Sequence, residues 1–234
     1  IGGSAGNIAV ALARQGAAVA MLSCVSGDAV GRFCLAELSR YGVDARHVRQ
    51  VSGGRRTSLA LTETVAEECQ TVLYRNEAAD FALAEEDASA VDFTKVAALV
   101  VTGTALAAEP SRSAARRAMT DAKAAGAIVV LDIDYRAYSW GSTEEAAQVC
   151  GDAARSSDVV IGNDVEFGLL AGGMDHGADF CGRLAHSSAL FSVYKRGAEG
   201  STTFTADFSF ATPVFRVTAL KPTGAGDAFM AAFV

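Results

Sequence analysis

Apolar runs and amphipathic stretches alternate along most of the chain. The runs at 17–22 and 127–132 are almost wholly apolar, a pattern typical of strands buried in a parallel sheet. The stretches at 111–125 and 143–154 follow strand-like runs and fit helices. This alternation predicts an α/β fold. The other predicted strands are 98–102, 158–161 and 190–194, with short β segments at 201–205 and 214–218, and the other predicted helices run from Asn7 to Gly16, through Phe33 to Gly42, and from 228 to 234.

Residues 57–75 interrupt this order. Polar and apolar residues alternate over 57–64 and again over 70–75, with a polar link at 65–68. Two such segments predict a half-exposed antiparallel hairpin. A hairpin inserted into an α/β chain often covers a ligand site, and Arg75 at its end could reach a ligand carboxylate. Taken alone, an arginine at a strand end is more often a solvated surface charge.

The composition limits the classes of function. Half of the 234 residues are hydrophobic and a fifth are charged, which is enough for a sizeable core. A net charge of −7 argues against nucleic acid or an anionic membrane as the main partner. No apolar run approaches the ~20 residues of a membrane span, and no signal peptide opens the chain.

The cysteines and histidines add no chemistry of their own. The five cysteines are widely spaced and form no C-x-x-C pair, which favours reduced thiols and a cytoplasmic location. The three histidines lack the spacing of zinc ligands. We expect one domain over 1–234. Ile1 already lies in a motif and Val234 in a helix, so we also expect further residues, including a strand, beyond these ends.

A glycine-rich turn at 221–229, with the sequence KPTGAGDAF, precedes the last predicted helix. Gly224, Ala225 and Gly226 leave backbone amides open at a helix start, and such amides bind anions. Asp227 lies in the same turn. It can complement the helix dipole, or it can accept a proton beside a bound phosphate. The spacing alone does not choose between these two interpretations.

Three further segments carry candidate site residues. Asn7 follows Gly2, Gly3 and Gly6 at the start of the first helix, where it can be a turn residue or bind a polar ligand. Residues 132–136, DIDYR, end a predicted strand, where ligands bind in α/β sheets; the alternative is a structural Asp–Arg pair. Asn163 and Glu166 have the spacing of a helix capping box. This spacing does not distinguish a capping role of Glu166 from a role in binding magnesium.

These segments together favour phosphoryl transfer. Lys195 and Arg196 precede a third glycine-rich turn, 197–200. There is no Walker A sequence and no dinucleotide-binding G-x-G-x-x-G followed by an acid about 20 residues later, which argues against a nicotinamide oxidoreductase. Phosphoryl transfer needs phosphate donors, a metal and a proton acceptor, and each has a candidate here. A small-molecule kinase fits these residues better than a redox enzyme.

The motifs at 2–7, GGSAGN, and 222–229, PTGAGDAF, resemble the two signatures of the ribokinase-like, PfkB-type carbohydrate kinases. The resemblance extends over the whole chain in the right order. It implies a central, mostly parallel sheet flanked by helices, with residues 57–75 as a small β lid. It also implies phosphorylation of a primary hydroxyl by ATP.

The resemblance assigns roles residue by residue. Asp227 matches the catalytic base, and Gly224, Ala225 and Gly226 match the anion hole for the transferred phosphoryl group. The remaining matches are Gly3 and Asn7 to sugar contacts, Asn163 and Glu166 to a motif linked to Mg²⁺ and phosphate, and Lys195, Gly197 and Gly200 to the border of the nucleotide. The implied cofactors are ATP and Mg²⁺.

One departure from the usual family sequence indicates the class of substrate. The family usually has Asp-Thr where this chain has Lys221-Pro222, which puts a nearby monovalent-cation site in doubt. Lys221-Pro222 and the segments at 74–80, 101–104, 131–136 and 140 are similar to the branch that phosphorylates 5-dehydro-2-deoxygluconate in inositol catabolism. Such a sugar acid needs a cationic partner, and Arg75 and Arg136 are the candidates.

Alternatives remain open. A 2-keto-3-deoxygluconate kinase would share the arginines, whereas a fructokinase would not need them. A non-catalytic sugar-binding relative would keep the fold, although the intact Gly-Ala-Gly-Asp sequence argues against it. The expected partner is a small sugar acid, with a homodimer through the lid as a further expectation.

Overall fold

The computed structural model describes residues 1–63, 71–217 and 223–234. They form two compact units. The first comprises Ile1–Val91, Glu109–Ala114 and Gly226–Val234. The second comprises Asp92–Ala108 and Ala115–Ala225.

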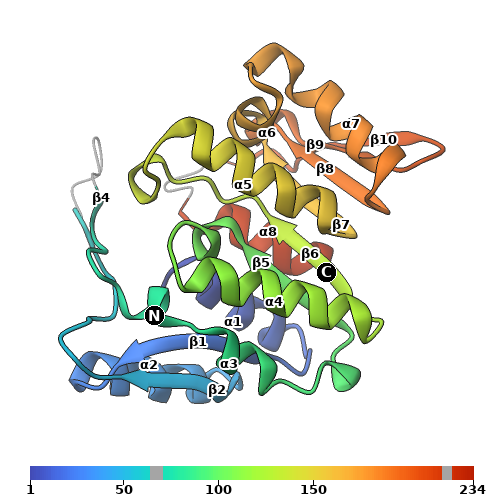
Figure 1. Cartoon of the computed structure of the whole chain (residues 1–234). Coiled ribbons are helices and arrows are strands. Elements are labelled where there is room, and N and C mark those ends of the chain that lie inside the picture. The colour runs from blue at the N-terminus through green and yellow to red at the C-terminus, as the bar shows by residue number, and fades with distance from the viewer. Residues whose placement is uncertain (64–70, 218–222) are drawn as a thin grey trace. The chain divides into compact units, whose positions relative to one another are not determined.

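The second unit is built on a six-stranded sheet in the order β10-β9-β8-β7-β6-β5 (Figure 1). The strands β5 (Ala98–Thr102), β6 (Ile128–Asp132), β7 (Val159–Asn163) and β8 (Phe191–Lys195) run parallel, and β9 (Ser201–Phe204) and β10 (Ser209–Thr212) continue the sheet antiparallel. Thr102 pairs with Asp132, and Asp132 pairs with Ile161. The carboxyl ends of the parallel strands therefore share one edge, where ligands bind in such sheets.

Helices follow the parallel strands of this sheet. They are α4 (Ser111–Ala124), α5 (Thr143–Ser156), α6 (Asp164–Ala171) and α7 (Gly177–Ser187), with α7 packed on β8. The sheet interior consists of fully buried aliphatic side chains, among them Val129, Val130, Leu131, Val160, Ile161 and Val193. Strands that are buried on both faces produce the continuous apolar runs seen in the sequence.

The first unit pairs β1 (Ala20–Ser26) in parallel with β2 (Asp44–Val51). Its helices are α1 (Ser4–Arg14), α2 (Ala29–Arg40), α3 (Glu85–Ser89) and α8 (Ala225–Phe233), the last crossing into this unit at Gly226. One core cluster joins α1, α2 and the two strands through Ala9, Val25, Leu38, Val43 and Val48. A side chain at position 31 would lie 1.7 Å from the carbonyl oxygen of Ser26, so only glycine lets α2 approach β1 there.

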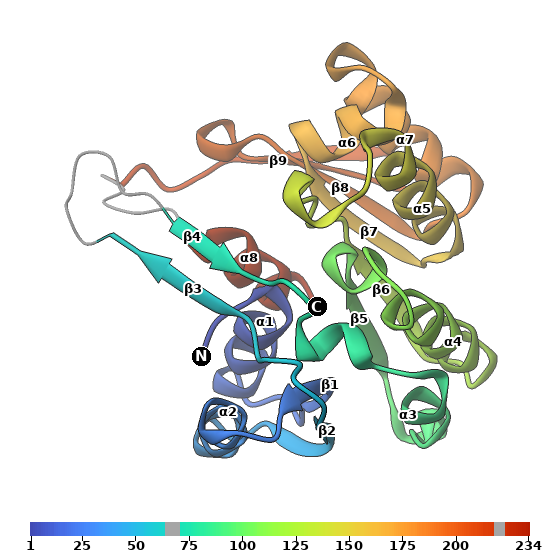
Figure 2. The same ribbon diagram turned by 60° about the vertical axis from the view of Figure 1, so that its left-hand side comes forward.

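The first unit contains the predicted antiparallel hairpin, whose role as a lid stays a prediction. The strands β3 (Leu59–Thr62) and β4 (Thr71–Tyr74) pair with Leu59 opposite Tyr74. Figure 2 shows them side by side and extending away from β1 and β2. The predicted link at 65–68 lies outside the described residues. Large apolar side chains are exposed on this hairpin: Leu59, Leu61, Val72, Leu73 and Tyr74.

Several element predictions were wrong. The strand predicted at 17–22 is β1, which begins at Ala20, because Ala17 still closes α1 by donating to the carbonyl of Leu12. The β segment predicted at 214–218 was also wrong, because residues 214–217 are not strand and 218 lies outside the described residues. The strand in this region is β10, which ends at Thr212, before Pro213, and was not predicted. The last helix begins at 225 rather than 228.

Other elements were not predicted at all, among them β2, α3 and α7. β2, with the sequence DARHVRQV, alternates weakly because polar side chains fill most of its positions. The helices α3 and α7 were also missed. α3 is only five residues long, and α7 starts with Gly177 directly after a short turn, without the side-chain cap that usually announces a helix. Within the described residues, no helix is both long and apolar enough to cross a membrane.

Candidate active site

The first unit joins two motifs from opposite ends of the chain. Asn7 lies in the second turn of α1, and Asp227 lies in the first turn of α8. The side-chain amide of Asn7 donates from Nδ2 to Oδ2 of Asp227 over 2.7 Å, across 220 positions of sequence. A second bond links the same helices, because Gln15 Nε2 donates to the carbonyl of Ala231 over 3.2 Å. Asn7 therefore contacts the predicted base directly.

Both helices begin at a glycine in the left-handed region. Gly3, with a φ of 83°, caps α1 and accepts the backbone N–H of Asn7 over 2.9 Å. Gly224, with a φ of 81°, immediately precedes α8. L-residues rarely adopt this conformation, so glycine suits both helix starts. The amides of Ala225, Gly226 and Asp227 lie in the first turn of α8, where helical N–H groups have no intrahelical acceptor and suit an anion.

Asn163 and Glu166 form a complete capping box at the start of α6, in the second unit. Asn163 Oδ1 accepts the backbone N–H of Glu166 over 2.9 Å, and Glu166 Oε2 accepts that of Asn163 over 2.7 Å. Glu166 Oε1 also accepts the backbone N–H of Tyr135, over 3.2 Å. The carboxylate thereby ties α6 to the segment after β6. The predicted capping box is confirmed, and the magnesium role stays a prediction.

The electrostatics of Glu166 follow from its position. Its side chain is nearly buried, and this burial raises the pKa of Glu166 above its usual range. The negative charge of Asp134 raises this pKa further, whereas the bond from Asn163 and the charges of Lys195 and Arg136 lower it. Among the residues with described positions, no group of three or more His, Cys, Asp or Glu side chains is arranged to hold a metal ion.

Lys195 lies beside this group, at the same edge of the sheet. It ends β8, pairs in register with Asn163 on β7, and places Nζ 3.9 Å from Oδ1 of Asp132 at the end of β6. The turn after it needs glycines, since Gly197 and Gly200 have φ values of 53° and 89°. A side chain at position 200 would also lie 2.2 Å from the carbonyl oxygen of Thr212. The structure therefore gathers Asn163, Glu166 and Lys195 on one sheet edge.

The two candidate arginines belong to different units, and each one pairs with an aspartate. Arg75 follows β4, bonds to Asp80 over 2.5 Å and lies over the ring of Phe81, with its side chain 15% exposed. Arg136 pairs with Asp134 over 2.7 Å, and its side chain is 44% exposed. The structural Asp–Arg pair weighed for 132–136 is thus present.

Sequence reasoning missed some partners at these sites. Asp80 lies five residues after Arg75 in the segment at 74–80, and a search for an acid near the arginine would have found it. Thr104, whose hydroxyl donates to Asp134 over 3.3 Å, lies in the segment at 101–104. No spacing rule connects Thr104 with Asp134, because the contact depends on the alignment of β5 with β6.

Comparison with known proteins finds relatives over the whole chain. The whole chain, residues 1–234, matches the sequence pattern of the pfkB family carbohydrate kinases. A 5-dehydro-2-deoxygluconokinase of Photobacterium profundum is 38% identical over 234 residues, covering 98% of this chain and 71% of that protein. The enzyme of the same name from Lacticaseibacillus casei is 34% identical, covering 100% of this chain and 73% of its own length.

Solved structures show the same fold. A double mutant of Vibrio cholerae fructokinase, with bound fructose, ADP and potassium ion, has a TM-score of 0.88 at 28% identity and covers 98% of this chain and 73% of its own. An aminoimidazole riboside kinase from Salmonella enterica has a TM-score of 0.85 at 24% identity, over 98% of this chain and 74% of its own. The second likeness concerns the fold alone.

Proposed function

Because the chain belongs to the pfkB family of carbohydrate kinases, we propose that it phosphorylates a primary hydroxyl of a sugar acid, 5-dehydro-2-deoxygluconate, with ATP. The bond between Asn7 and Asp227 carries this proposal. It joins the candidate sugar-binding residue to the candidate base in one unit. The relatives named 5-dehydro-2-deoxygluconokinase support the choice of substrate.

The proposed mechanism assigns the chemistry to α8. Asp227 accepts the proton of the sugar hydroxyl as the oxygen bonds to the γ-phosphorus and the bond to ADP breaks. The first-turn amides of α8, from Ala225 to Asp227, stabilise the charge on the transferred phosphoryl group. The transition state in such transfers is loose, so an oriented carboxylate that takes the proton late suffices.

The nucleotide belongs to the second unit in this proposal. Lys195, Gly197 and Gly200 border ATP, and Asn163 supports its phosphates. Mg²⁺, when bound, would neutralise phosphate charge, and Glu166 is the residue that would hold it, through a water molecule. Both oxygens of Glu166 already accept backbone N–H bonds, which favours this indirect contact over direct ligation.

Two arginines suit a carboxylate substrate. A guanidinium binds a carboxylate through two parallel hydrogen bonds, so Arg75 and Arg136 are the proposed contacts. A sugar acid of this kind places the reaction in inositol catabolism, and ATP as donor supports a cytoplasmic location. The exposed apolar side chains of β3 and β4 support a homodimer through the lid.

The alternatives differ in substrate or in activity. A 2-keto-3-deoxygluconate kinase would keep the arginine contacts, whereas a fructokinase, the activity of one solved relative, would not use them. A non-catalytic sugar-binding protein would need neither Asp227 nor the glycine turn before it. The presence of both favours a kinase.

One assay separates these functions. ADP release by the full-length protein with Mg-ATP is measured on 5-dehydro-2-deoxygluconate, 2-keto-3-deoxygluconate, fructose and ribose in parallel. We expect turnover on the first acid. Preference for the second acid would keep the carboxylate contact and change the substrate. Turnover on the neutral sugars alone would refute the acid assignment, and sugar binding without ADP release would favour the non-catalytic protein.

A further inference from the structure

Asp134 is a buried acid in an unusual backbone conformation. It follows β6 by two residues, its φ is 37°, and its side chain is 3% exposed. Aspartate is one of the few non-glycine residues that enter the left-handed region, and a buried carboxylate needs charged or hydrogen-bonding partners. A surface-charge role does not explain an acid in this position. The residues that contact the carboxylate of Asp134 therefore indicate its role.

One side of Asp134 is fixed by the segment after β5. Thr104 Oγ1 lies 3.3 Å from Oδ2 of Asp134, as donor, and 3.0 Å from Oγ1 of Thr102. Gly103 makes this contact possible, because a side chain at position 103 would lie 2.0 Å from the carbonyl oxygen of Ile133. Close backbone approach at Gly103 thus places Thr104 against the carboxylate.

The other side of Asp134 holds Arg136. Oδ1 of Asp134 lies 2.7 Å from one terminal nitrogen of the guanidinium, and the other terminal nitrogen donates to the carbonyl of Tyr135 over 3.1 Å. Among the described residues, these two contacts engage two of the five N–H groups of Arg136. The guanidinium is therefore held by one buried acid while its side chain remains 44% exposed.

We propose that Asp134 is a positioning residue that fixes the guanidinium of Arg136 for the carboxylate of the substrate. This inference rests on the proposed sugar-acid kinase function. An exposed arginine alone loses side-chain entropy when it binds a carboxylate, and a preformed pair reduces that loss. The three remaining N–H groups, one on Nε and one on each terminal nitrogen, are the donors that this pair presents to a carboxylate. Asp134 thereby tunes specificity for an acid without contacting the substrate.

The competing explanation is that Arg136 only neutralises Asp134. Both explanations predict a loss of stability on mutation, so stability does not distinguish them. The distinguishing quantity is the ratio of KM for the sugar acid to KM for its uncharged carboxamide. Only a residue that positions a carboxylate contact changes this ratio.

The test compares three variants in the full-length protein. Asp134→Ala is expected to raise KM for the acid about 10- to 100-fold, the range for a charge-assisted hydrogen bond, with kcat and KM for the carboxamide little changed. Asp134→Asn keeps an acceptor for Thr104 and Arg136 and is expected to give an intermediate ratio. Arg136→Lys keeps the charge but not the planar fork, and is expected to raise KM for the acid as well.

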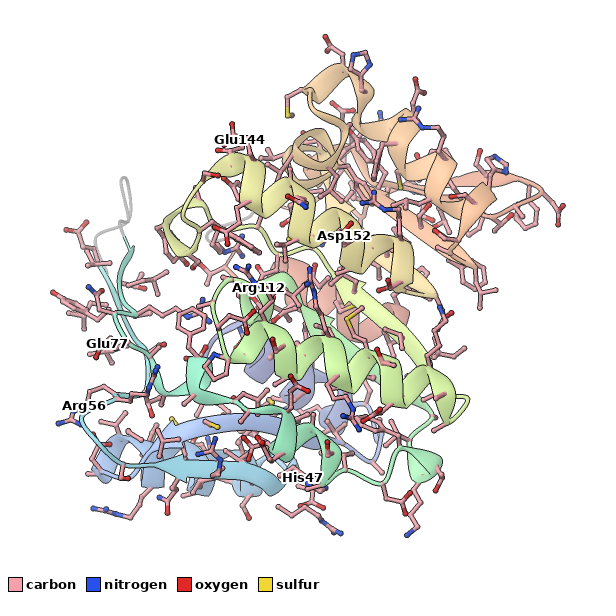
Figure 3. All side chains as sticks on the ribbon, viewed as in Figure 1. His47, Arg56, Glu77, Arg112, Glu144 and Asp152 are labelled. Carbon is pink, nitrogen blue, oxygen red and sulfur yellow. The ribbon has the colours of Figure 1, made fainter. Side chains whose placement is uncertain are left out.

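The matched control is Asp152→Asn. Asp152 pairs with Arg155 over the same 2.7 Å on α5, and Figure 3 labels it there. For Asp152→Asn, the ratio of KM for the sugar acid to KM for the carboxamide is expected to equal that of the wild type. If the wild type prefers the acid and the Asp134 variants retain that preference, the positioning role is refuted while the kinase proposal stands. If the wild type itself does not prefer the acid, the sugar-acid assignment fails first and this inference fails with it. If Asp134→Ala does not fold, the same ratio of KM values measured for Asp134→Asn and Arg136→Lys tests the positioning role.

Discussion

At the scale of single residues, the bond between Asn7 and Asp227 would give Asn7 two of the proposed roles, sugar binding and orientation of the base. Nδ2 of Asn7 donates to the carboxylate, which leaves Oδ1 of the same amide as an acceptor. A sugar hydroxyl that donates to Oδ1 would therefore be tied to the base through Asn7. Under the proposed function, sugar binding and orientation of the base would then be coupled through Asn7.

Asn7→Leu keeps the approximate volume of the side chain. It removes the hydrogen bond to Asp227 and the proposed bond from the sugar hydroxyl to Oδ1. We expect kcat to fall and KM for the sugar to rise, each about tenfold, because the lost hydrogen bond involves a charged acceptor. ATP binding should be unchanged. Steady-state kinetics and nucleotide titration of the full-length protein measure these effects.

Gln15→Leu is the matched control for Asn7→Leu. It removes the other side-chain bond between α1 and α8, the one to the carbonyl of Ala231. We expect some loss of stability and near-normal kinetics. Equal kinetic losses in the two variants would show that α1 and α8 merely need to stay packed, and the specific role of Asn7 would be abandoned.

The residues of the candidate site were predictable mainly where they lie in a motif. Asp227 and Asn7 each lie in a short glycine-rich motif, and Asn163 and Glu166 have the spacing of a capping box, so the local sequence indicates each of them. Thr104 and Asp80 were not predicted, because their roles come from contacts with Asp134 and Arg75 that form only in the fold. The hydrogen bond from Asn7 to Asp227 also depends on the packing of α1 against α8, which the sequence does not show.

At the scale of elements, β2 and α3 are joined by an ion pair that stabilises the first unit. Arg49 Nε and one terminal nitrogen lie 2.7 and 2.8 Å from the two oxygens of Asp87. The same terminal nitrogen also donates to the carbonyl of Ala82. The hydrogen bond from Arg49 is the main reason that the pKa of Asp87 is lowered below its usual value of 3.8. A two-pronged pair of this geometry is stronger than a typical surface pair.

Asp87→Asn removes this charge and leaves the side chain its size. Since the pKa of Asp87 is lower in the folded than in the unfolded state, the ionised pair stabilises the fold above pH 3.8, and this stability is lost as pH falls through the lowered pKa. We expect the variant to be less stable by about 1 kcal/mol at pH 7. The difference should shrink toward zero as the pH falls below 3.8.

Urea unfolding of both proteins across that pH range measures the difference. A difference that stayed constant down to the lowest pH would mean that Asp87 stabilises α3 through its bond to the backbone of Ala84 rather than through its charge. Arg46 and Asp44, an exposed pair on β2, serve as a control, and Asp44→Asn should have a much smaller effect.

Elements with strong patterns were predicted well, and the others were not. The strands β6 and β7 and the helices α4 and α5 have apolar runs or helical periodicity, so their positions follow from the sequence. β2 is rich in polar residues, among them the exposed Arg46, Arg49 and Gln50, and its two buried valines, Val48 and Val51, do not follow the alternation that would indicate a strand paired with β1. The start of β1 was misplaced because apolar residues 17–19 still belong to the end of α1 and the turn after it.

At the scale of the whole molecule, the two units divide the proposed work. The first holds Asn7, Asp227 and Arg75, and the second holds Lys195, Glu166 and Arg136. The sequence predicted an α/β chain with a lid, and the resemblance of the two signatures predicted the fold of the family. The division into units was not predicted, because no linker or change in composition marks it: the chain crosses between the units within α4 and at the start of α8.

The central claim is that Asp227, at the start of α8, is the base of a sugar kinase. The most direct test is kcat of Asp227→Asn in the full-length protein, with ATP binding measured alongside. We predict that kcat falls at least about 100-fold, the low end for loss of general-base catalysis, while ATP still binds. Turnover close to that of the wild type, with the variant folded, would contradict the assignment of Asp227 and with it the proposed mechanism.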